Sequence, residues 1–373
     1  MNEQSLASRN AHRDDHIHDY PSMDDDILVA GSPDPPEPRS NSSRTHLIYI
    51  LMFSSLHPNK IHHDLRSHPL DLPTSYETLP TTGHVVVSHY PPGNPAVTPV
   101  LIVTLNRPAN HNAFTAQMIQ DFETLFPLFN VDERVKVIVL TGAGKTFCAG
   151  ADLDIGFSGV GEKNADHRDG GGRMSLAIHH CRKPTIAAMQ GSAVGVGMTM
   201  TLPAMIRICH AKSKYGFVFG RRGVTMEACS SYFLPRLIGH SNANYLVGTG
   251  GVFPPTAKHF GDLFNEILPE ASQVLPRALE LATDMAENVS PSASYLNRAL
   301  MWRNPESPEA AHLVESRVIY HMFGAADQKE GVQSFFEKRK PNFRANLDDN
   351  PPPNLPWWSQ VDTGRSPKAA SKL

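Results

Sequence analysis

The chain has 373 residues, 40% of them hydrophobic, which is enough to bury one large core or two ordinary ones. Its 34 lysines and arginines nearly balance 37 aspartates and glutamates, so no overall positive field favours nucleic acid as a partner. The four cysteines form no CxxC pair and no zinc-ligand spacing with histidine, which excludes a zinc module and favours reduced thiols.

Residues 1–81 are rich in His, Asp, Arg, Ser and Pro. A segment of this composition buries too little apolar surface to offset the entropy lost on ordering, so we predict a disordered polar extension. Its most apolar run, Leu47–Leu56, has about ten residues, half the length of a bilayer-spanning helix. We therefore predict no membrane span.

The next segment, residues 82–250, alternates strand and helix patterns. Val85–Val87 and Val100–Leu105 flank a Pro/Gly turn and predict a hairpin. Apolar residues between Met118 and Phe129 recur at helical spacing, and the run Val135–Leu140 is typical of a strand buried on both faces.

A second unit repeats this order. It has a helix near Met174–His180, a strand at Thr185–Met189 and a strand at Met205–His210. Such alternation predicts an α/β core. Residues 251–343 carry helical patterns at Leu275–Ala286, Ser292–Trp302 and Pro308–Phe323, which predict a helical module. Residues 344–373 form a Pro/Ser/Lys-rich tail that we expect to be flexible.

The tail ends in Ser371, Lys372 and Leu373, the tripeptide that the peroxisomal import receptor reads. We therefore expect a peroxisomal location.

Two turns of small residues, Phe147–Leu153 and Gly191–Gly197, each lead from a predicted strand toward a predicted helix. Backbone N–H groups at such places are left without intrahelical partners and favour a developing negative charge. Small residues also permit tight turns with no ligand at all. Two such turns together favour an oxyanion hole.

A single carboxylate, Glu227, lies among small and apolar residues in Met226–Arg236. Such surroundings raise the pKa of a glutamate and suit it to proton transfer. The alternative is a structural carboxylate at a helix start, paired with Arg221 or Arg222.

Other site motifs are incomplete. The phosphate loop suggested by Gly142–Thr146 needs a glycine where Val139 stands, and the dinucleotide fingerprint begun by Gly195 needs one at Met200. Asp152 and Asp154 have no evident third metal ligand, so we expect no metal and no cofactor.

From about His84 to Phe343 the chain resembles the crotonase superfamily, the enoyl-CoA hydratases and isomerases. The resemblance lies in Leu105–Pro108 with Asn112 and Ala113, in the two small-residue turns, and in a closing helix at Glu330–Pro341. It implies an α/β fold, a spiral of repeated ββα units with a C-terminal helical oligomerisation module, and a homotrimer or hexamer. CoA then enters as part of the substrate.

The resemblance also implies residue roles. The first oxyanion donor falls on the N–H of Ala151 and the second on that of Val196. The residues that it places around the substrate are Ala149, Gly150, Ala151, Asp152, Leu153, Val196 and Gly197. The basic residues that it places toward the CoA phosphates are Arg107, Lys145, Lys338 and Lys340.

Hydratases of this superfamily use two glutamates, but the matching positions here are Thr199 and Phe219. Glu227, followed by Ala-Cys-Ser-Ser-Tyr, instead resembles the segment with the single catalytic glutamate of peroxisomal Δ3,Δ2-enoyl-CoA isomerases. We therefore expect an enoyl-CoA isomerase with Glu227 as its base, acting in fatty-acid β-oxidation or related acyl-CoA metabolism. A hydratase or dehydratase of secondary metabolism and a non-catalytic acyl-CoA-binding subunit stay open as alternatives.

Overall fold

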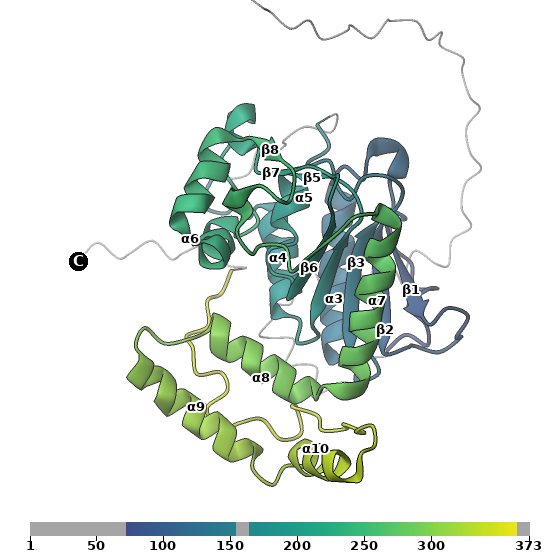
Figure 1. The fold of residues 1–373 in the computed structure, drawn as a ribbon, viewed down its shortest axis with the longest axis vertical. Helices are drawn as coiled ribbons and strands as arrows, with labels where there is room; N and C mark the ends of the chain where they lie inside the picture. Colours follow the sequence, from purple (N-terminus) through teal and green to yellow (C-terminus); the bar gives the residue numbers. More distant parts are fainter. Residues whose placement is uncertain (1–71, 154–163, 364–373) are drawn as a thin grey trace, which may run out of the picture. The chain divides into compact units, whose positions relative to one another are not determined.

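The computed structural model describes residues 72–153 and 164–363. Its largest element is a six-stranded sheet, in which β1 runs antiparallel to β2 and the other neighbours are parallel (Figure 1). The strands in spatial order are β1 (Val85–Tyr90), β2 (Val100–Leu105), β3 (Val137–Gly142), β4 (Thr185–Met189), β6 (Ile206–His210) and β9 (Glu266–Leu268). The predicted hairpin and buried strands are thus confirmed, with β3 displaced by two residues from the prediction.

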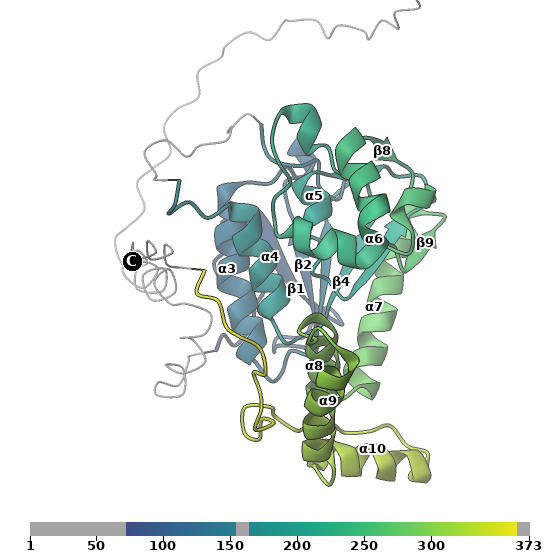
Figure 2. The same ribbon diagram turned by 90° about the vertical axis from the view of Figure 1, so that its left-hand side faces the viewer.

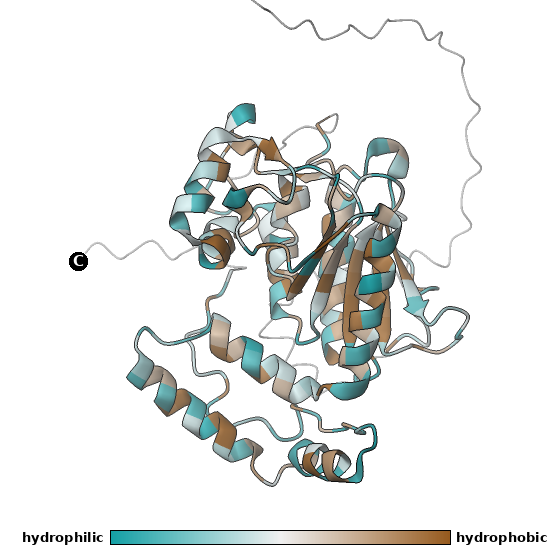
Figure 3. Cartoon of the chain, in the orientation of Figure 1, coloured by the Kyte–Doolittle hydropathy of each residue, from teal (hydrophilic) through white to brown (hydrophobic). Residues whose placement is uncertain are grey.

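Helices cover both faces of this sheet. Helices α3 (Ala116–Val131) and α4 (Gly170–His180) lie on one face and α7 (Ala271–Asn288) on the other (Figure 2). The inner strands β2, β3 and β4 are mostly hydrophobic (Figure 3), and alternate side chains belong to different cores. Ile138 packs with the α3 side and Val139 with the α7 side, because successive side chains of a strand point to opposite faces.

A small second sheet joins β5 (Ala193–Val194), β7 (Tyr215–Gly216) and β8 (Val252–Phe253). Isolated parallel bridges, Cys148 with Ala193 and Phe114 with Ala151, extend the same pairing pattern into the small-residue turns. Along the chain, a strand of the large sheet is therefore followed by a short strand or bridge outside that sheet and then by a helix. This is the repeated ββα organisation that the family resemblance implied.

The C-terminal module consists of α8 (Pro291–Trp302), α9 (Pro308–Met322) and α10 (Ala326–Glu337). Ser290 and Ser307 cap the first two of these helices, each with proline in the first turn, where the missing N–H is not needed. The remaining helices are α5 (Val196–Thr199), α6 (Ser230–Thr249) and the short 3-10 turns η1 (Pro108–Asn110), η2 (Phe219–Arg222) and η3 (Lys258–Phe260). No described helix has the length and apolarity needed to span a bilayer.

The structure corrects the expected start of the folded domain. Residues 1–71 lie outside the described residues, but residues 72–81 belong to the fold, because Tyr76 is only 1% exposed and its hydroxyl donates to Asp132. The polar composition of the preceding residues hid this one aromatic anchor.

The expected flexible tail also needs a correction in its first part. Leu347 is buried beside Leu296 and Val318, Arg182 donates to Asp348, and the Trp357 indole donates to the carbonyl of Arg303. Residues 344–363 are therefore docked along the C-terminal helices, as the yellow coil in Figure 1 shows. Residues 364–373, which include Ser371, Lys372 and Leu373, lie outside the described residues.

Candidate active site

The first small-residue turn leaves a backbone donor available at Ala151. Phe114 donates from its N–H to the Gly150 carbonyl and accepts from the N–H of Asp152, so the intervening Ala151 N–H points away from this pairing. Among the described residues it has no acceptor. Gly150 adopts φ +101°, a conformation that a side chain would strain. The turn thus leaves the Ala151 N–H available, and the oxyanion role that the resemblance implies for it stays a prediction.

The second turn offers a donor at the start of α5. Val196 is the first residue of this helix, so its N–H has no intrahelical acceptor, and no other described residue accepts from it. Val194 donates to the Cys148 carbonyl over 3.2 Å, which holds the second turn against the first. The two predicted donors therefore come from turns that pack side by side.

The structure places Glu227 against α5. The Thr199 hydroxyl donates to Glu227 Oε1 over 2.7 Å, and Thr199 lies three residues after the Val196 donor. Glu227 itself is half-buried in the turn before α6. The alternative pairing with arginine is not seen: Arg221 donates to the Thr249 carbonyl and Arg222 to that of Arg221.

Burial raises the pKa of Glu227 to about 7, and the nearby charge of Asp169 acts in the same direction. The hydrogen bond from Thr199 opposes both effects, since it stabilises the charged carboxylate. A carboxyl group that titrates near neutral pH can both accept and return a proton at that pH. Glu227 also raises the pKa of the buried Cys148 thiol, to which burial contributes most.

The hydroxyl of Thr199 is a functional group that sequence reasoning undervalued. Its position matches that of a hydratase glutamate, so the sequence indicated only that this catalytic acid is missing. The structure shows that the same position directs a hydrogen bond at the remaining carboxylate. Phe219, at the other missing acid, is 7% exposed and packs in the main core.

The remaining residues of the predicted substrate turns take distinct places. Gly150, Asp152 and Gly197 are buried, whereas Ala149 is exposed and Leu153 is 59% exposed. This exposed leucine supplies apolar surface beside the Ala151 N–H.

The four basic candidates for CoA binding divide into two groups. Arg107 donates to Asp152 Oδ2 over 2.7 Å and to the Ala113 carbonyl, and its side chain is only 15% exposed. The Arg107 guanidinium therefore stabilises the first turn and is already engaged, which argues against a role in binding phosphate. Lys340 pairs with Glu287 at the surface, and only Lys145 and Lys338 are exposed without a described ionic partner.

The Leu105–Ala113 motif holds the first turn in place. It does so through Asn112 and through the ion pair of Arg107 with Asp152. The Asn112 side chain accepts from the Arg107 N–H and donates to the carbonyls of Ala143 and Thr146. These bonds tie the motif to the strand that leads into the first turn. In the described residues no three metal-ligating side chains gather, and Asp154 lies outside them.

Comparison with known proteins identifies the family of the chain. The family described as Enoyl-CoA hydratase/isomerase matches residues 97–346. An enoyl-CoA hydratase of Alternaria alternata is 48% identical over 66% of this chain and 84% of its own length. A mevalonyl-coenzyme A hydratase of Beauveria bassiana is 34% identical over 65% of this chain and 90% of its own.

Among solved structures, one described as a probable enoyl-CoA hydratase/isomerase from Mycobacterium abscessus superposes with a TM-score of 0.60 at 32% identity. The match covers 66% of this chain and 96% of that one. The mixed α/β core and helical C-terminal region therefore have the crotonase fold. The chain belongs to the enoyl-CoA hydratase/isomerase family.

Proposed function

We propose that this protein is an enoyl-CoA isomerase that moves the double bond of a 3-enoyl-CoA to the 2-position. The observation that carries the proposal is one half-buried carboxylate, Glu227, whose pKa is raised to about 7 and which accepts from Thr199, in the short helix that begins at the Val196 donor. Both positions that would hold hydratase acids carry other residues, Thr199 and Phe219. A double-bond shift needs only one group that takes and returns a proton.

In the proposed reaction the ionised Glu227 removes a proton from C2 of the 3-enoyl thioester. The electron pair moves into the thioester, and the N–H groups of Ala151 and Val196 stabilise the negative oxygen of the dienolate. The protonated Glu227 then returns the same proton to C4, which leaves the double bond between C2 and C3. No atom is gained or lost, and no cofactor takes part.

A hydratase is the second candidate, and the names of the relatives favour it. Three proteins of Alternaria alternata at 46–48% identity are called enoyl-CoA hydratases. Hydration adds a hydroxyl at C3 and a proton at C2, work that two acids usually share. In the part of the chain that the structure describes, Asp169 is a second carboxylate whose charge acts on Glu227.

Turnover of matched thioesters distinguishes the candidates. The purified protein is given a 3-enoyl-CoA, with the conjugated product followed by its absorbance, and a 2-enoyl-CoA, with hydration followed by loss of that absorbance. We expect faster turnover of the 3-enoyl substrate. Preferred hydration would establish the hydratase instead, and binding of both thioesters without turnover would establish a non-catalytic acyl-CoA-binding subunit.

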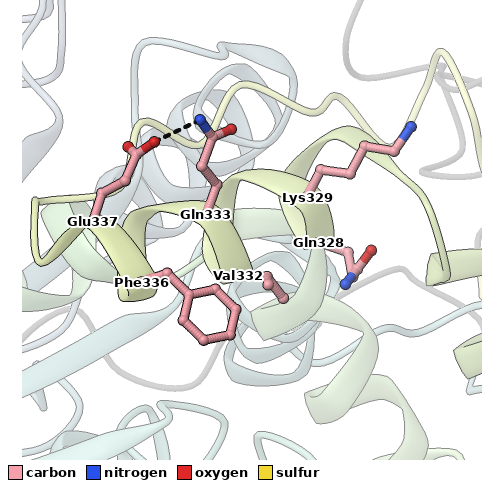
Figure 4. A pocket seen from close by; sticks show the side chains of 6 residues that line it. All are labelled: Gln328, Lys329, Val332, Gln333, Phe336 and Glu337. Atoms are coloured by element: carbon pink, nitrogen blue, oxygen red, sulfur yellow. Dashed lines mark hydrogen bonds between the residues drawn. The ribbon is translucent and has the colours of Figure 1, made fainter.

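We also propose a homotrimer or hexamer, formed through the C-terminal module. Large apolar side chains there are left exposed, among them Tyr320, Phe323, Phe335 and Phe336 at 76%, 63%, 78% and 77%. Val332 and Phe336 also line a hollow of about 520 Å³ on α10, next to Gln333 and Glu337 (Figure 4). Apolar groups so gathered are usually covered by a partner.

We expect light scattering of the wild-type protein to give the mass of a trimer or hexamer. Replacing Phe335 and Phe336 together with serine should shift it toward the monomer, because the subunit contact loses apolar area. Exchange of the exposed Gln117 for serine, on α3 and away from this module, is the control. A wild-type monomer with full activity would refute the assembly.

The peroxisomal location is likewise a proposal. It rests on Ser371, Lys372 and Leu373, which match the receptor-read address. In cells, an N-terminal fluorescent fusion should reach peroxisomes, and removal of the tripeptide should leave it outside. Unchanged import after the deletion would count against the signal.

A further inference from the structure

One carboxylate bridges helix α4 and the turn that carries Glu227. Asp169 is the N-cap of α4, and its Oδ1 accepts from the Gly172 N–H over 2.5 Å. The same oxygen accepts from the N–H of Ala228 over 3.3 Å. Ala228 directly follows Glu227, so Asp169 connects the base to a helix that is remote in sequence.

The turn after Glu227 has a backbone that needs such support. Ala228 and Cys229 both adopt left-handed conformations, with φ 58° and 55°. Residues other than glycine rarely adopt this conformation and keep it only where the surroundings hold them. The N–H of Ser230 donates to the Glu227 carbonyl and closes the turn from the other side.

Gly171 supplies the space for the carboxylate. A Cβ atom placed on this residue would overlap Glu227 Oε2 and would stand 3.2 Å from the Ala228 Cβ. The Glu227 carboxylate therefore lies directly against the first turn of α4. Thr199 holds its other oxygen, Oε1, from α5.

We propose that Asp169 and Gly171 are positioning residues for Glu227: Asp169 clamps the turn of the base, and Gly171 leaves the room its carboxylate occupies. This inference rests on the proposed function, because it assigns to Glu227 the role of the base. It extends that function by making the start of α4 part of the catalytic machinery.

Asp169 also acts on Glu227 through its charge. The groups that face Glu227 are Asp169 from the start of α4, Thr199 from α5, Cys148 from the first turn and Cys229 from its own turn. Burial raises the pKa of Cys148 to about 12 and that of Cys229 to about 11, so both thiols stay neutral near pH 7. Burial is the main cause of the raised pKa of Glu227, and among the described residues Asp169 is the neighbour whose charge adds to it.

Two substitutions separate the clamp from the charge. Asp169→Asn keeps an acceptor and a good N-cap but removes the charge, whereas Asp169→Ala removes both. Asp166→Asn is the control, because it removes an exposed charge three residues earlier that bonds to neither α4 nor the glutamate turn in the described structure. The readouts are kcat/KM against pH and the titration of Glu227 by isotope-edited infrared difference spectroscopy against Glu227→Gln.

We expect Asp169→Asn to retain its high-pH activity, while the infrared titration of Glu227 and the acid limb of the rate profile move together to lower pH. Asp169→Ala should lower kcat by roughly tenfold to a hundredfold with little change in KM, because the base is misplaced. Gly171→Ala should lower kcat by about a hundredfold for the same reason. Asp166→Asn should match the wild type.

The proposal is overturned if Glu227 titrates at the same pH in Asp169→Asn as in the wild type, or if Asp169→Ala keeps full kcat. Equal losses of activity in both Asp169 variants with an unmoved titration would show that Asp169 only caps α4, which also overturns it. A wild-type protein that turns over neither thioester would contradict the proposed function alone, because the infrared titration needs no substrate.

Discussion

Replacing Glu227 with glutamine should lower isomerase kcat by at least about a hundredfold, because general acid–base catalysis is typically worth ~10²–10⁴. Glutamine has the size of glutamate and still accepts the hydrogen bond from Thr199. It has no useful proton affinity near pH 7. Binding of a CoA thioester, measured by calorimetry, should change little.

Thr199→Ala is the matched control for this variant. It removes the hydroxyl that contacts Glu227 but leaves the carboxylate, so its loss of kcat should be much smaller. The lost bond favours the charged form, and its removal should raise the pKa of Glu227 further. The acid limb of the rate profile should then move to higher pH, opposite to the shift expected for Asp169→Asn.

Glu227→Gln should also change how the free energy of unfolding depends on pH. The pKa of Glu227 rises from 4.5 to about 7 on folding, so between these values the folded chain binds more protons than the unfolded one. The contribution of Glu227 to the free energy of unfolding is therefore fully present below pH 4.5 and is lost as the pH rises through 7. Glu227→Gln should therefore gain stability relative to the wild type at pH 8 and not at pH 4.

Near-normal isomerase turnover in Glu227→Gln would contradict the single-base mechanism. Glu227 would then be a structural carboxylate. A variant that loses hydration but not isomerisation would instead assign Glu227 to the second candidate function.

The sequence predicted the parts of the site that depend on local pattern. The turns around Ala151 and Val196 were recognisable because small residues follow strand patterns and precede helices. Strand β4 agrees with its predicted range because Thr185–Met189 is a short buried run. In such runs the residue types themselves determine the backbone.

Contacts between distant segments were not predictable in this way. Asp169 and Ala228 are 59 residues apart, and nothing near Asp169 in the sequence indicates that its carboxylate reaches the glutamate turn. The room that Gly171 provides has the same origin, since it appears only when α4 packs beside that turn. The sequence suggested Arg107 as a phosphate ligand because it does not show the ion pair with Asp152, which is 45 residues away.

The start of the fold was misjudged for a related reason. Composition averages over a window, and the polar residues before position 82 outweighed the single aromatic ring of Tyr76. That ring packs edge-on against Phe129 with centroids 5.0 Å apart, and its hydroxyl donates to Asp132 Oδ2 over 3.0 Å. Its N–H also donates to His89, which ties the segment to β1.

Removing residues 1–81 should therefore destabilise the protein, whereas removing residues 1–71 should leave its free energy of unfolding close to that of the full chain. The difference lies in Tyr76, which is 1% exposed. Deleting a buried aromatic side chain costs about 3–5 kcal/mol, so Tyr76→Ala should reproduce most of the loss in the full-length chain. Denaturant unfolding at one protein concentration measures these differences.

Tyr76→Phe tests the hydroxyl alone. Arg134 continues to bond Asp132 through Nε and a terminal nitrogen, so the carboxylate stays paired when the phenol is removed. The expected cost is about 1 kcal/mol, the usual net value of one hydrogen bond. Thr74→Ala, at an exposed position of the same segment, should stay within about 0.5 kcal/mol of the wild type. Equal stability of the two truncations would mean that Tyr76 contributes nothing to the core, and the folded domain would then begin at β1.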